Sequence, residues 1–515
     1  MRPSLTPVAL VAGTEDFARR LTAAVRGTFH VPATTLVGVN LSDARRAALS
    51  LRPNLLVVEL GFATTPADAR WLKQLLEDLR SRFGRKFFSV VAVTDPAKLL
   101  FAGDLLFREA TSLAPSGLVD TFLFTPPRGM TTLPSLEAQL LDCYTIWAEL
   151  LELTADGTNP LPALWEPAWA PTLSAPESRN VWFRWLPRYA RYTNENPLIL
   201  GPSGSGKTRL AEALHMLSGR PGPFISITPR DFSSAELVQA ELFGAVEGAY
   251  TGAVEKWGLV KRAEKGTLFI DELQSIDLDL QGKLITFIEN KSYRRVGEAE
   301  SHRADVRFVF ATNRPLDELV AQGRLRDDFA YRLERLQLTL PPLSERRLDI
   351  AAGASFALAK VFRERSDSGI QEIGPKRSSP AIEGLSTDGY RTLLAASWPG
   401  NLRQLENSIA KLMDLTHLCG ERLISVDSVH QALRGMLGSV EADGASILSR
   451  AAEQTAYQAA QGQIHSLERC WIFLASQARA LALEHAGGSA EAASTLIGDS
   501  PSAMETFASV RGVHR

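Results

Sequence analysis

The sequence has few cysteines, no long apolar run and almost no net charge, and each absence narrows what the protein can be. Its three cysteines, Cys143, Cys419 and Cys470, lie far apart, which predicts neither a disulfide framework nor a metal site and fits a reducing compartment. No apolar run reaches about 18 residues and no secretion signal is evident, so we expect a cytoplasmic protein that does not span a membrane. A net charge of -2 excludes a protein whose whole surface binds nucleic acid.

The chain has 515 residues, too many for one hydrophobic core, and its pattern divides it into segments. Residues 1–150 alternate apolar runs, such as PNLLVVELG and FFSVVAVT, with helix-like stretches, which predicts a doubly wound parallel sheet. A proline-rich stretch over 151–180 predicts a linker. A second α/β region is expected over 181–345, a helical region over 346–435, and a small all-α domain over 436–515.

The segment LILGPSGSGKTRL places an apolar strand before a glycine-rich loop and a helical pattern after it. This context predicts a phosphate-binding P-loop, because small residues let backbone N–H groups converge on phosphate oxygens. A plain glycine-rich turn is the alternative. We expect Lys207 to reach the β- and γ-phosphates and Thr208 to help hold Mg²⁺. The predicted nucleotide-binding residues of the loop are Gly201, Pro202, Ser203, Gly204, Ser205, Gly206, Lys207 and Thr208.

Two later strands are predicted to bring polar side chains to the same edge of the sheet. GTLFIDEL delivers Asp271 and Glu272 to the carboxyl end of a strand, where open α/β sheets bind ligands. Asp271 suits a Mg²⁺ shell, and Glu272 could polarise an attacking water. VRFVFATN ends at Asn313, whose amide could sense the γ-phosphate or cap a helix instead.

Three arginines are candidates for stabilising charge on a transferring phosphoryl group. Arg326 and Arg332 lie in GRLRDDFAYRL, and Arg403 lies in WPGNLRQLEN, where a turn opens a helix. Such a charge can also come from a partner subunit. Taken singly, each arginine could equally be a surface residue in a salt bridge.

Together these motifs resemble the sigma-54-dependent transcriptional activators, a bacterial family of AAA+ ATPases. The resemblance covers about residues 181–435 and is carried by GPSGSGKT, AELFGAVEGAYTGA, GTLFIDEL, RRVGE, VRFVFATNR, GRLRDDFAYRL, LPPLSERRLDI and WPGNLRQLEN. It implies an AAA+ core with a helical lid that uses ATP and Mg²⁺. It also implies a homo-oligomeric ring, expected to be a hexamer, that remodels closed complexes of the sigma-54 RNA polymerase holoenzyme so that promoter DNA opens.

The resemblance gives each candidate residue a role. It assigns Lys207 and Thr208 to nucleotide and Mg²⁺, Asp271 and Glu272 to Mg²⁺ and water, Asn313 to sensing, Arg326 and Arg332 to fingers acting across the subunit interface, and Arg403 to a second sensor. The family usually has an asparagine in the strand after the P-loop helix, which restrains the catalytic glutamate. Thr228 stands at that place here, and its hydroxyl can still donate and accept one hydrogen bond.

The stretch GAYTGA looks like the signature GAFTGA loop of the family, with Tyr250 in place of phenylalanine. The resemblance implies that the loop projects from the ring and touches sigma-54 through Gly248, Ala249, Tyr250, Thr251, Gly252 and Ala253. Small residues make a flexible tip, and one aromatic ring supplies contact area at low entropic cost. A plain β-turn with a chance aromatic is the alternative.

The first 128 residues resemble a response-regulator receiver domain in strand order, without its phosphorylation chemistry. Ala12 and Gly13 replace the acidic pair, and Glu59 stands at the phospho-accepting position. Thr94 keeps the strand-four threonine, whereas Thr125 replaces the lysine of strand five. We interpret this segment as a pseudo-receiver. A different flavodoxin-like module is the alternative.

The C-terminal stretch ALEHAGGSAEAASTLIGDSPSAMETF resembles the Fis-type helix-turn-helix of the same activators, but its recognition segment SPSAMETF carries Glu505 and no basic residue. That composition argues against tight, specific binding to an upstream enhancer-like DNA site. Two functions therefore stay open. The chain is either a DNA-tethered activator or an interaction protein that contacts sigma-54 or a related activator without itself binding DNA specifically. An AAA+ chaperone or protease subunit is disfavoured, because those lack a loop of the GAYTGA type.

Overall fold

The computed structural model of the protein describes most of the first 433 residues and one short segment beyond them. The described residues are 8–29, 33–37, 41–51, 53–62, 66–83, 88–107, 118–154, 172–367, 382–419, 421–433 and 475–482. Contacts divide the chain into two compact units, Met1–Met436 and Leu437–Arg515. In the second unit residues 475–482 are helical, and the predicted helix-turn-helix lies outside the described residues.

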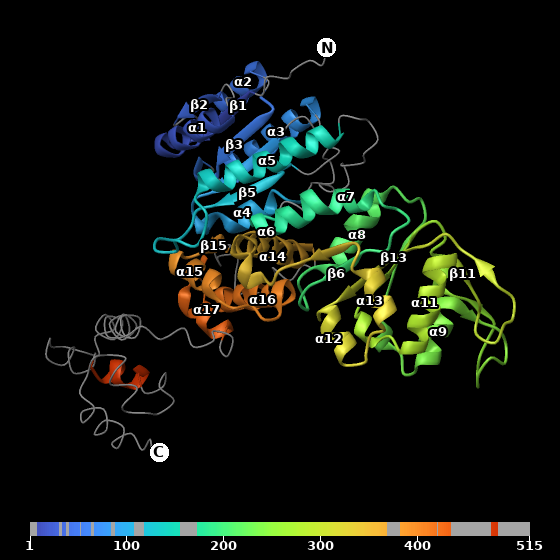
Figure 1. Ribbon diagram of the computed structural model, residues 1–515. Helices are drawn as coiled ribbons and strands as arrows, with labels where there is room; N and C mark the ends of the chain where they lie inside the picture. The colour runs from blue at the N-terminus through green and yellow to red at the C-terminus, as the bar shows by residue number, and fades with distance from the viewer. Residues whose placement is uncertain are drawn as a thin grey trace, which may run out of the picture. The chain divides into compact units, whose positions relative to one another are not determined.

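A five-stranded parallel sheet forms the N-terminal domain, in the order β2-β1-β3-β4-β5 (Figure 1). This is the flavodoxin-like order, so the predicted doubly wound, receiver-like architecture is confirmed. The strands are β1 (Ala9–Gly13), β2 (Ala33–Val37), β3 (Leu55–Glu59), β4 (Phe88–Val93) and β5 (Thr121–Phe124). The helices are α1 (Glu15–Phe29), α2 (Leu41–Leu51), α3 (Pro66–Phe83), α4 (Leu99–Asp104) and α5 (Leu136–Thr154).

The apolar runs of this domain are strands because they are buried along their whole length. Strands β1, β3, β4 and β5 are fully buried, which is typical of a parallel sheet covered by helices on both faces. The sequence analysis missed β2, whose sequence ATTLV contains two threonines and does not read as a continuous apolar run.

The described ends of the predicted linker are helical. Helix α5 continues to Thr154, and helix α6 (Pro176–Arg179) begins with a proline in its first turn, where the missing N–H costs nothing. The chain then continues as a π-helix, η6 (Asn180–Trp185), and α7 (Leu186–Ala190). Apolar side chains of these two segments are buried in the ATPase core, beginning at Val181.

A second five-stranded parallel sheet, in the order β14-β6-β13-β10-β7, forms the ATPase core. Its strands are β6 (Leu198–Leu200), β7 (Phe224–Ile227), β10 (Thr267–Ile270), β13 (Arg307–Thr312) and β14 (Gln337–Thr339). Its helices are α8 (Lys207–Ser218), α9 (Ala235–Phe243), α10 (Leu259–Arg262), α11 (Leu278–Asn290), α12 (Leu316–Ala321) and α13 (Asp327–Leu333). Because the strands are parallel, the carboxyl ends of β6, β10 and β13 meet at one edge of the sheet.

Two short antiparallel pairs extend from this core. They are β8 (Gly244–Ala245) with β9 (Lys256–Trp257), and β11 (Ser292–Tyr293) with β12 (His302–Arg303). Short 3₁₀ turns complete the connections: η1 (Leu60–Phe62), η3 (Pro96–Lys98), η7 (Pro229–Asp231), η8 (Leu273–Ser275) and η9 (Leu343–Glu345).

The predicted helical lid follows the ATPase core. It consists of α14 (Arg347–Asp367), α15 (Thr387–Ala395), α16 (Asn401–Cys419) and α17 (Val426–Ala432), with the parallel pair β15 (Gly384–Leu385) and β16 (Leu423–Ile424). Trp398 anchors the turn before α16. Its indole is 2% exposed and donates to the carbonyl oxygen of Leu393 at 3.0 Å.

Candidate functional site

The glycine-rich loop follows β6 and leads directly into α8, as the sequence predicts. Gly204 and Gly206 have φ angles of 74° and 105°, in the left-handed region that favours glycine. The loop also lies against the lid, because a Cβ atom added to Gly204 would come within 2.4 Å of the carbonyl oxygen of Gly400. Glycine at 204 is therefore needed both for the backbone conformation and for the close approach of the lid.

Lys207, the first residue of α8, is 8% exposed. Its Nζ donates to the carbonyl oxygens of Gly201 and Pro202 at 3.0 and 3.2 Å. Burial lowers the pKa of Lys207, and the nearby carboxylates of Asp271 and Glu272 act against that shift. A largely buried cation bonded to neutral carbonyl groups is suited to bind an anion.

One cavity of about 270 Å³ brings most of the predicted site together. It is lined by Ser203, Gly204, Gly206, Lys207, Thr208, Arg209, Asp271, Glu272, Asn313, Leu402, Arg403 and Glu406. The hydroxyl of Thr208 and the carboxylate of Asp271 are oxygen ligands of the kind that Mg²⁺ takes beside substrate phosphates. The residues present therefore fit a nucleotide with its magnesium ion.

Glu272 is held in an uncommon backbone conformation. Its φ and ψ are both 55°, the left-handed region, and its N–H donates to Oδ1 of Asp271 at 2.8 Å. Non-glycine residues in this region cost free energy and occur at functional sites. Both carboxylates line the same cavity at this strand end.

The side chain bonded to Glu272 is that of Arg230, which the sequence analysis did not select. Nη1 of Arg230 donates to the two carboxylate oxygens at 2.9 and 2.8 Å. Thr228, the residue predicted to restrain Glu272, precedes η7, and its carbonyl oxygen accepts from the N–H of Asp231. The only signal in the sequence was that Arg230 lies two residues after Thr228, where the family has asparagine. The sequence does not show that the Arg230 side chain extends to Glu272.

Asn313 lies at the end of β13 and is oriented by Gln274 of η8, another residue that sequence reasoning missed. The amide of Gln274 donates to Oδ1 of Asn313 at 3.1 Å and accepts from the hydroxyl of Thr312 at 2.9 Å. Asn313 is also one of the residues that line the cavity.

The lid contributes Arg403 to the cavity through the turn at the start of α16. Asn401 has a φ of 52° and is 1% exposed. Its Nδ2 donates to the carbonyl oxygen of Ser203 at 2.9 Å, and the N–H of Leu402 donates to the carbonyl oxygen of Gly204 at 3.0 Å. The lid therefore holds the P-loop by backbone and amide contacts, and this arrangement places Arg403 at the cavity.

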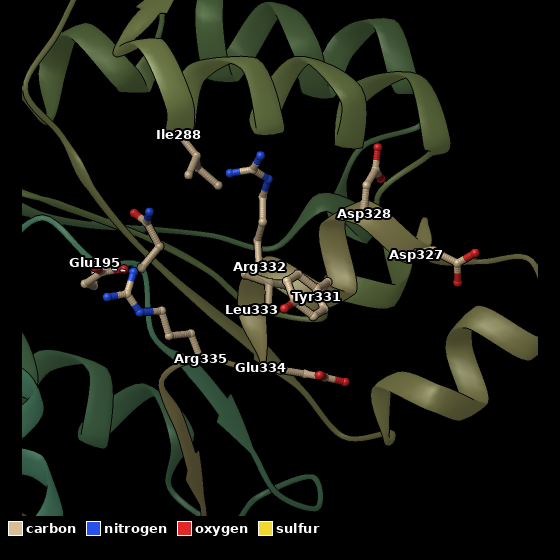
Figure 2. A pocket seen from close by; sticks show the side chains of 10 residues that line it. Glu195, Ile288, Asp327, Asp328, Tyr331, Arg332, Leu333, Glu334 and Arg335 are labelled. Atoms are coloured by element: carbon tan, nitrogen blue, oxygen red, sulfur yellow. Dashed lines mark ion pairs between the residues drawn. The ribbon is translucent and has the colours of Figure 1, made fainter.

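Arg326 and Arg332 lie away from that cavity, beside and within α13. Arg326 makes two hydrogen bonds to the carboxylate of Asp328, at 3.0 and 2.9 Å, and Arg332 pairs with Glu289. Figure 2 shows Arg332 extending from α13 toward the helix that carries Ile288, in a separate pocket of about 910 Å³. Neither side chain is among those that line the cavity of Lys207 and Asp271.

The GAYTGA loop connects β8 to β9 and consists of two successive turns. The N–H of Ala249 donates to the carbonyl oxygen of Val246 at 3.2 Å, and the N–H of Ala253 donates to that of Tyr250 at 2.9 Å. Gly248 and Gly252 occupy the third position of the two turns, with φ angles of 78° and 82°. A type II turn requires a positive φ at this position, so the four-residue spacing of the glycines encodes the loop's shape.

The loop exposes its centre and is anchored at its base. Thr251 is exposed and Tyr250 is half-buried, whereas Ala253 is 9% exposed. At the base, the guanidinium of Arg295 lies 4.4 Å from the ring centre of Trp257 and bonds to Glu255 at 3.0 Å. This ties the loop to the neighbouring hairpin of β11 and β12.

In the N-terminal domain the carboxylate of Glu59 occupies the edge of the sheet where a receiver carries its acidic cluster. Oε2 accepts from the N–H and the hydroxyl of Thr14 at 2.7 and 2.8 Å, and Oε1 accepts from the hydroxyl of Thr94 at 2.9 Å. A Cβ atom added to Gly13 would lie 2.9 Å from Oε2 of Glu59 and 2.2 Å from the ring of Phe17. Thr14 and Thr94 therefore bind the carboxylate of Glu59 itself, a side chain of the protein and not an added phosphoryl group.

A P-loop and an acidic strand end that share a cavity with a lid arginine define this region as a P-loop ATPase domain of the AAA+ class. Residues 182–339 match the family described as the Sigma-54 interaction domain, and residues 367–444 match the AAA+ ATPase lid domain. Over these residues the chain is similar to the sigma-54-dependent activators that the sequence motifs indicated.

The chain is similar to named regulators of transcription over the same region. It is 42% identical over 242 residues to the alginate biosynthesis transcriptional regulatory protein AlgB of Pseudomonas aeruginosa, covering 47% of this chain and 50% of that protein. It is 39% identical over 225 residues to the luminescence regulatory protein LuxO of Vibrio campbellii, covering 42% of this chain and 46% of that protein. The chain thus spans about half the length of the curated relatives it matches.

A solved structure of NtrX from Brucella abortus aligns with 99% of this chain and 100% of its own, at 20% identity and a TM-score of 0.44. Within the described residues, no helix is long and apolar enough to cross a membrane.

Proposed function

We propose that the chain is an ATP-hydrolysing transcriptional activator that works as a ring of identical subunits, expected to be a hexamer. It would remodel closed complexes of sigma-54 RNA polymerase so that promoter DNA opens. The observation that carries this proposal is the double-turn GAYTGA loop between β8 and β9, in an AAA+ domain with one cavity lined by Lys207, Thr208, Asp271 and Glu272.

The residues of the cavity divide the chemistry between them. The loop's N–H groups and Lys207 bind the phosphates, and Thr208 and Asp271 would hold Mg²⁺. When bound, Mg²⁺ offsets the negative charge of the β- and γ-phosphate oxygens. Glu272 accepts the proton of the attacking water, and Asn313 orients that water or senses the γ-phosphate.

The finger arginines would come from the adjacent subunit. Arg326 and Arg332 are engaged with carboxylates of their own chain, so docking of a neighbouring nucleotide site must exchange those partners for phosphate. Both ion pairs are partly exposed, and such pairs are weak enough to be exchanged at an interface. Hydrolysis around the ring would then move the GAYTGA loops.

The pair of Arg230 and Glu272 has a measurable consequence for this mechanism. While both oxygens of Glu272 accept from Arg230, the ion pair fixes the orientation of the carboxylate and must loosen before the carboxylate can turn toward a water. We expect Arg230→Ala to raise basal ATP turnover roughly two- to fivefold, because an exposed ion pair is a weak restraint. Steady-state phosphate release measures it, with Lys261→Ala, an exposed lysine of α10, as the control. An unchanged or lower rate would show that Arg230 does not restrain the base.

The test of the whole proposal is retention of purified sigma-54 by the protein in the presence of a transition-state analogue of ATP hydrolysis. We expect retention by the unaltered chain and a loss of about tenfold or more in Thr251→Ala, because Thr251 is exposed at the centre of the loop. Thr286→Ala is the matched control, since its hydroxyl is exposed on α11 and bonds only to its own helix at Gly282.

The possible outcomes of this experiment separate the hypotheses. Retention that Thr251→Ala removes and Thr286→Ala preserves would establish GAYTGA as the working loop. A protein that hydrolyses ATP but retains no sigma-54 would contradict the activator proposal and leave a ring ATPase with another substrate.

The alternative is an interaction protein that contacts sigma-54 or a related activator without specific DNA binding. It is favoured by the recognition segment SPSAMETF, which has no basic residue. Titration with duplex DNA at several salt concentrations distinguishes the two, because a tethered activator binds specific sites with a salt-dependent affinity.

A further inference from the structure

A buried chain of hydrogen bonds runs from the N-terminal domain to the P-loop, and we infer that it makes this domain a positioning element of the nucleotide site. Its residues are Arg179, Ser178, Asp349, Arg346 and Ser205, and each is at most 2% exposed. None of them except Ser205 belongs to the site described above. The inference rests on nucleotide binding at the proposed site and adds an input to it.

Asp349, in the first turn of α14, is the centre of this chain. Its Oδ1 accepts from the N–H groups of Ser174 and Ala175, both at 2.7 Å, and its Oδ2 accepts from the hydroxyl of Ser178. A buried carboxylate satisfied by three donors fixes the backbone that leads into α6. The end of the interdomain connection is thereby attached to the lid helix.

Arg346 carries the connection to the P-loop. Its Nη1 lies 3.3 Å from both Ser178 Oγ and Asp349 Oδ2, and its Nη2 donates to the carbonyl oxygen of Ser205 at 2.7 Å. Ser205 immediately precedes Gly206, where the loop turns into α8. Because the charges of Arg346 and Asp349 are buried together, removal of either partner would leave the other uncompensated.

Arg179 carries the connection in the other direction, into the N-terminal domain. Its Nη2 donates to the hydroxyl of Thr121 on β5 at 2.9 Å, and its Nη1 donates to Asp142 on α5 at 3.1 Å. The guanidinium belongs to the residue that follows Ser178. Two adjacent residues therefore join the N-terminal domain to the Asp349 centre.

A second contact fixes the same two parts. Helix α4 packs against α14, and Figure 1 shows the two helices side by side. The contact is close, because a Cβ atom added to Gly103 would lie 1.8 Å from the carbonyl oxygen of Ser355. The carboxylate of Asp104 accepts from Nε of Arg363 at 2.9 Å, and the ring of Phe107 stacks on that of Phe356 at 5.5 Å. Helix α14 is thus held by the N-terminal domain along its length and by the P-loop at its start.

Coupling follows from these shared contacts. Phosphate binding requires the backbone groups of the P-loop to be in one arrangement. Arg346 helps to fix that arrangement through its hydrogen bond to the carbonyl oxygen of Ser205. Any change that loosens Arg179 in the N-terminal domain loosens Ser178, Asp349 and Arg346 with it. By linkage, nucleotide binding must then tighten the N-terminal domain by the same factor.

The experiment compares the full-length chain with Arg179→Met, which keeps much of the volume and removes the hydrogen bonds to Thr121 and Asp142. We expect the Kd for a fluorescent ADP analogue to rise about five- to fiftyfold. Thr121→Val, which removes only one acceptor, should give a smaller change in the same direction. Arg19→Met is the matched control, because Arg19 pairs only with Glu15 on the exposed face of α1.

Amide hydrogen exchange supplies a measurement that would not change if Arg179 only stabilised the fold. In the unaltered chain, ADP should slow amide exchange in β5 and α5, and in Arg179→Met this protection should disappear. If Arg179→Met does not fold, the protection of β5 and α5 and the Kd of Thr121→Val still decide the matter. Unchanged Kd values with no protection would overturn the inference alone, whereas an unaltered chain that binds no ADP would overturn the proposed function as well.

Discussion

Replacement of Glu272 by glutamine is expected to lower ATP turnover by roughly 10²- to 10⁴-fold, the range that a general base contributes. The amide keeps the size of the side chain and can still lie beside Arg230, but it cannot accept a proton from water. Phosphate binding by the P-loop and Lys207 does not require the carboxylate. The variant should therefore bind ATP and retain it without hydrolysis.

Single-turnover hydrolysis and a separate binding titration measure these two properties. Glu212→Gln is the matched control, because Glu212 is exposed on α8 and does not line the cavity. Turnover by Glu272→Gln close to that of the unaltered chain would exclude Glu272 as the base. The next candidate would then be Asp271, at the same strand end.

Replacement of Lys207 by alanine is expected to weaken nucleotide affinity roughly 30- to 4,000-fold. Among the described residues, Lys207 is the only lysine that lines the cavity, and its side chain is largely buried. Loss of one partner of a buried, hydrogen-bonded charge pair costs about 2–5 kcal/mol, and about 1.4 kcal/mol corresponds to a factor of ten. Turnover at saturating ATP would fall too, because the charge also serves the transferring phosphoryl group.

Calorimetric titration with ADP and ATP gives the affinities directly. Lys411→Ala, an exposed lysine on α16, should bind both nucleotides like the unaltered chain. An affinity for ATP within threefold of the unaltered value in Lys207→Ala would mean that the loop's N–H groups alone hold the phosphates.

Much of the candidate site could be predicted because its chemistry is encoded locally. The P-loop needs small residues at fixed spacing after a strand, and Asp271 and Asn313 each follow a buried strand directly. Parallel strands then bring their carboxyl ends to one edge whatever the details of packing. The same logic gave the receiver-like sheet, in which every predicted run became a strand.

The residues that sequence reasoning missed depend on contacts between distant parts of the chain. Arg230 reaches Glu272 across 42 positions, and Arg346 reaches the carbonyl oxygen of Ser205 across 141. The local sequence pattern shows neither which distant residue an arginine side chain contacts nor how deeply that side chain is buried. Strand β2 was missed for a different reason, since its threonines weaken the apolar signal that marks a buried strand.

The carboxylate of Glu59, bonded on both oxygens by Thr14 and Thr94, has a consequence for how a cell could govern this protein. A phosphorylated receiver lets a cell switch molecules that already exist, within seconds, and then reverse the change. In this chain the carboxyl group of Glu59 is part of the encoded sequence and is therefore present in every copy of the protein. We therefore expect control of this protein to act through the number of copies made, their lifetime and their partners.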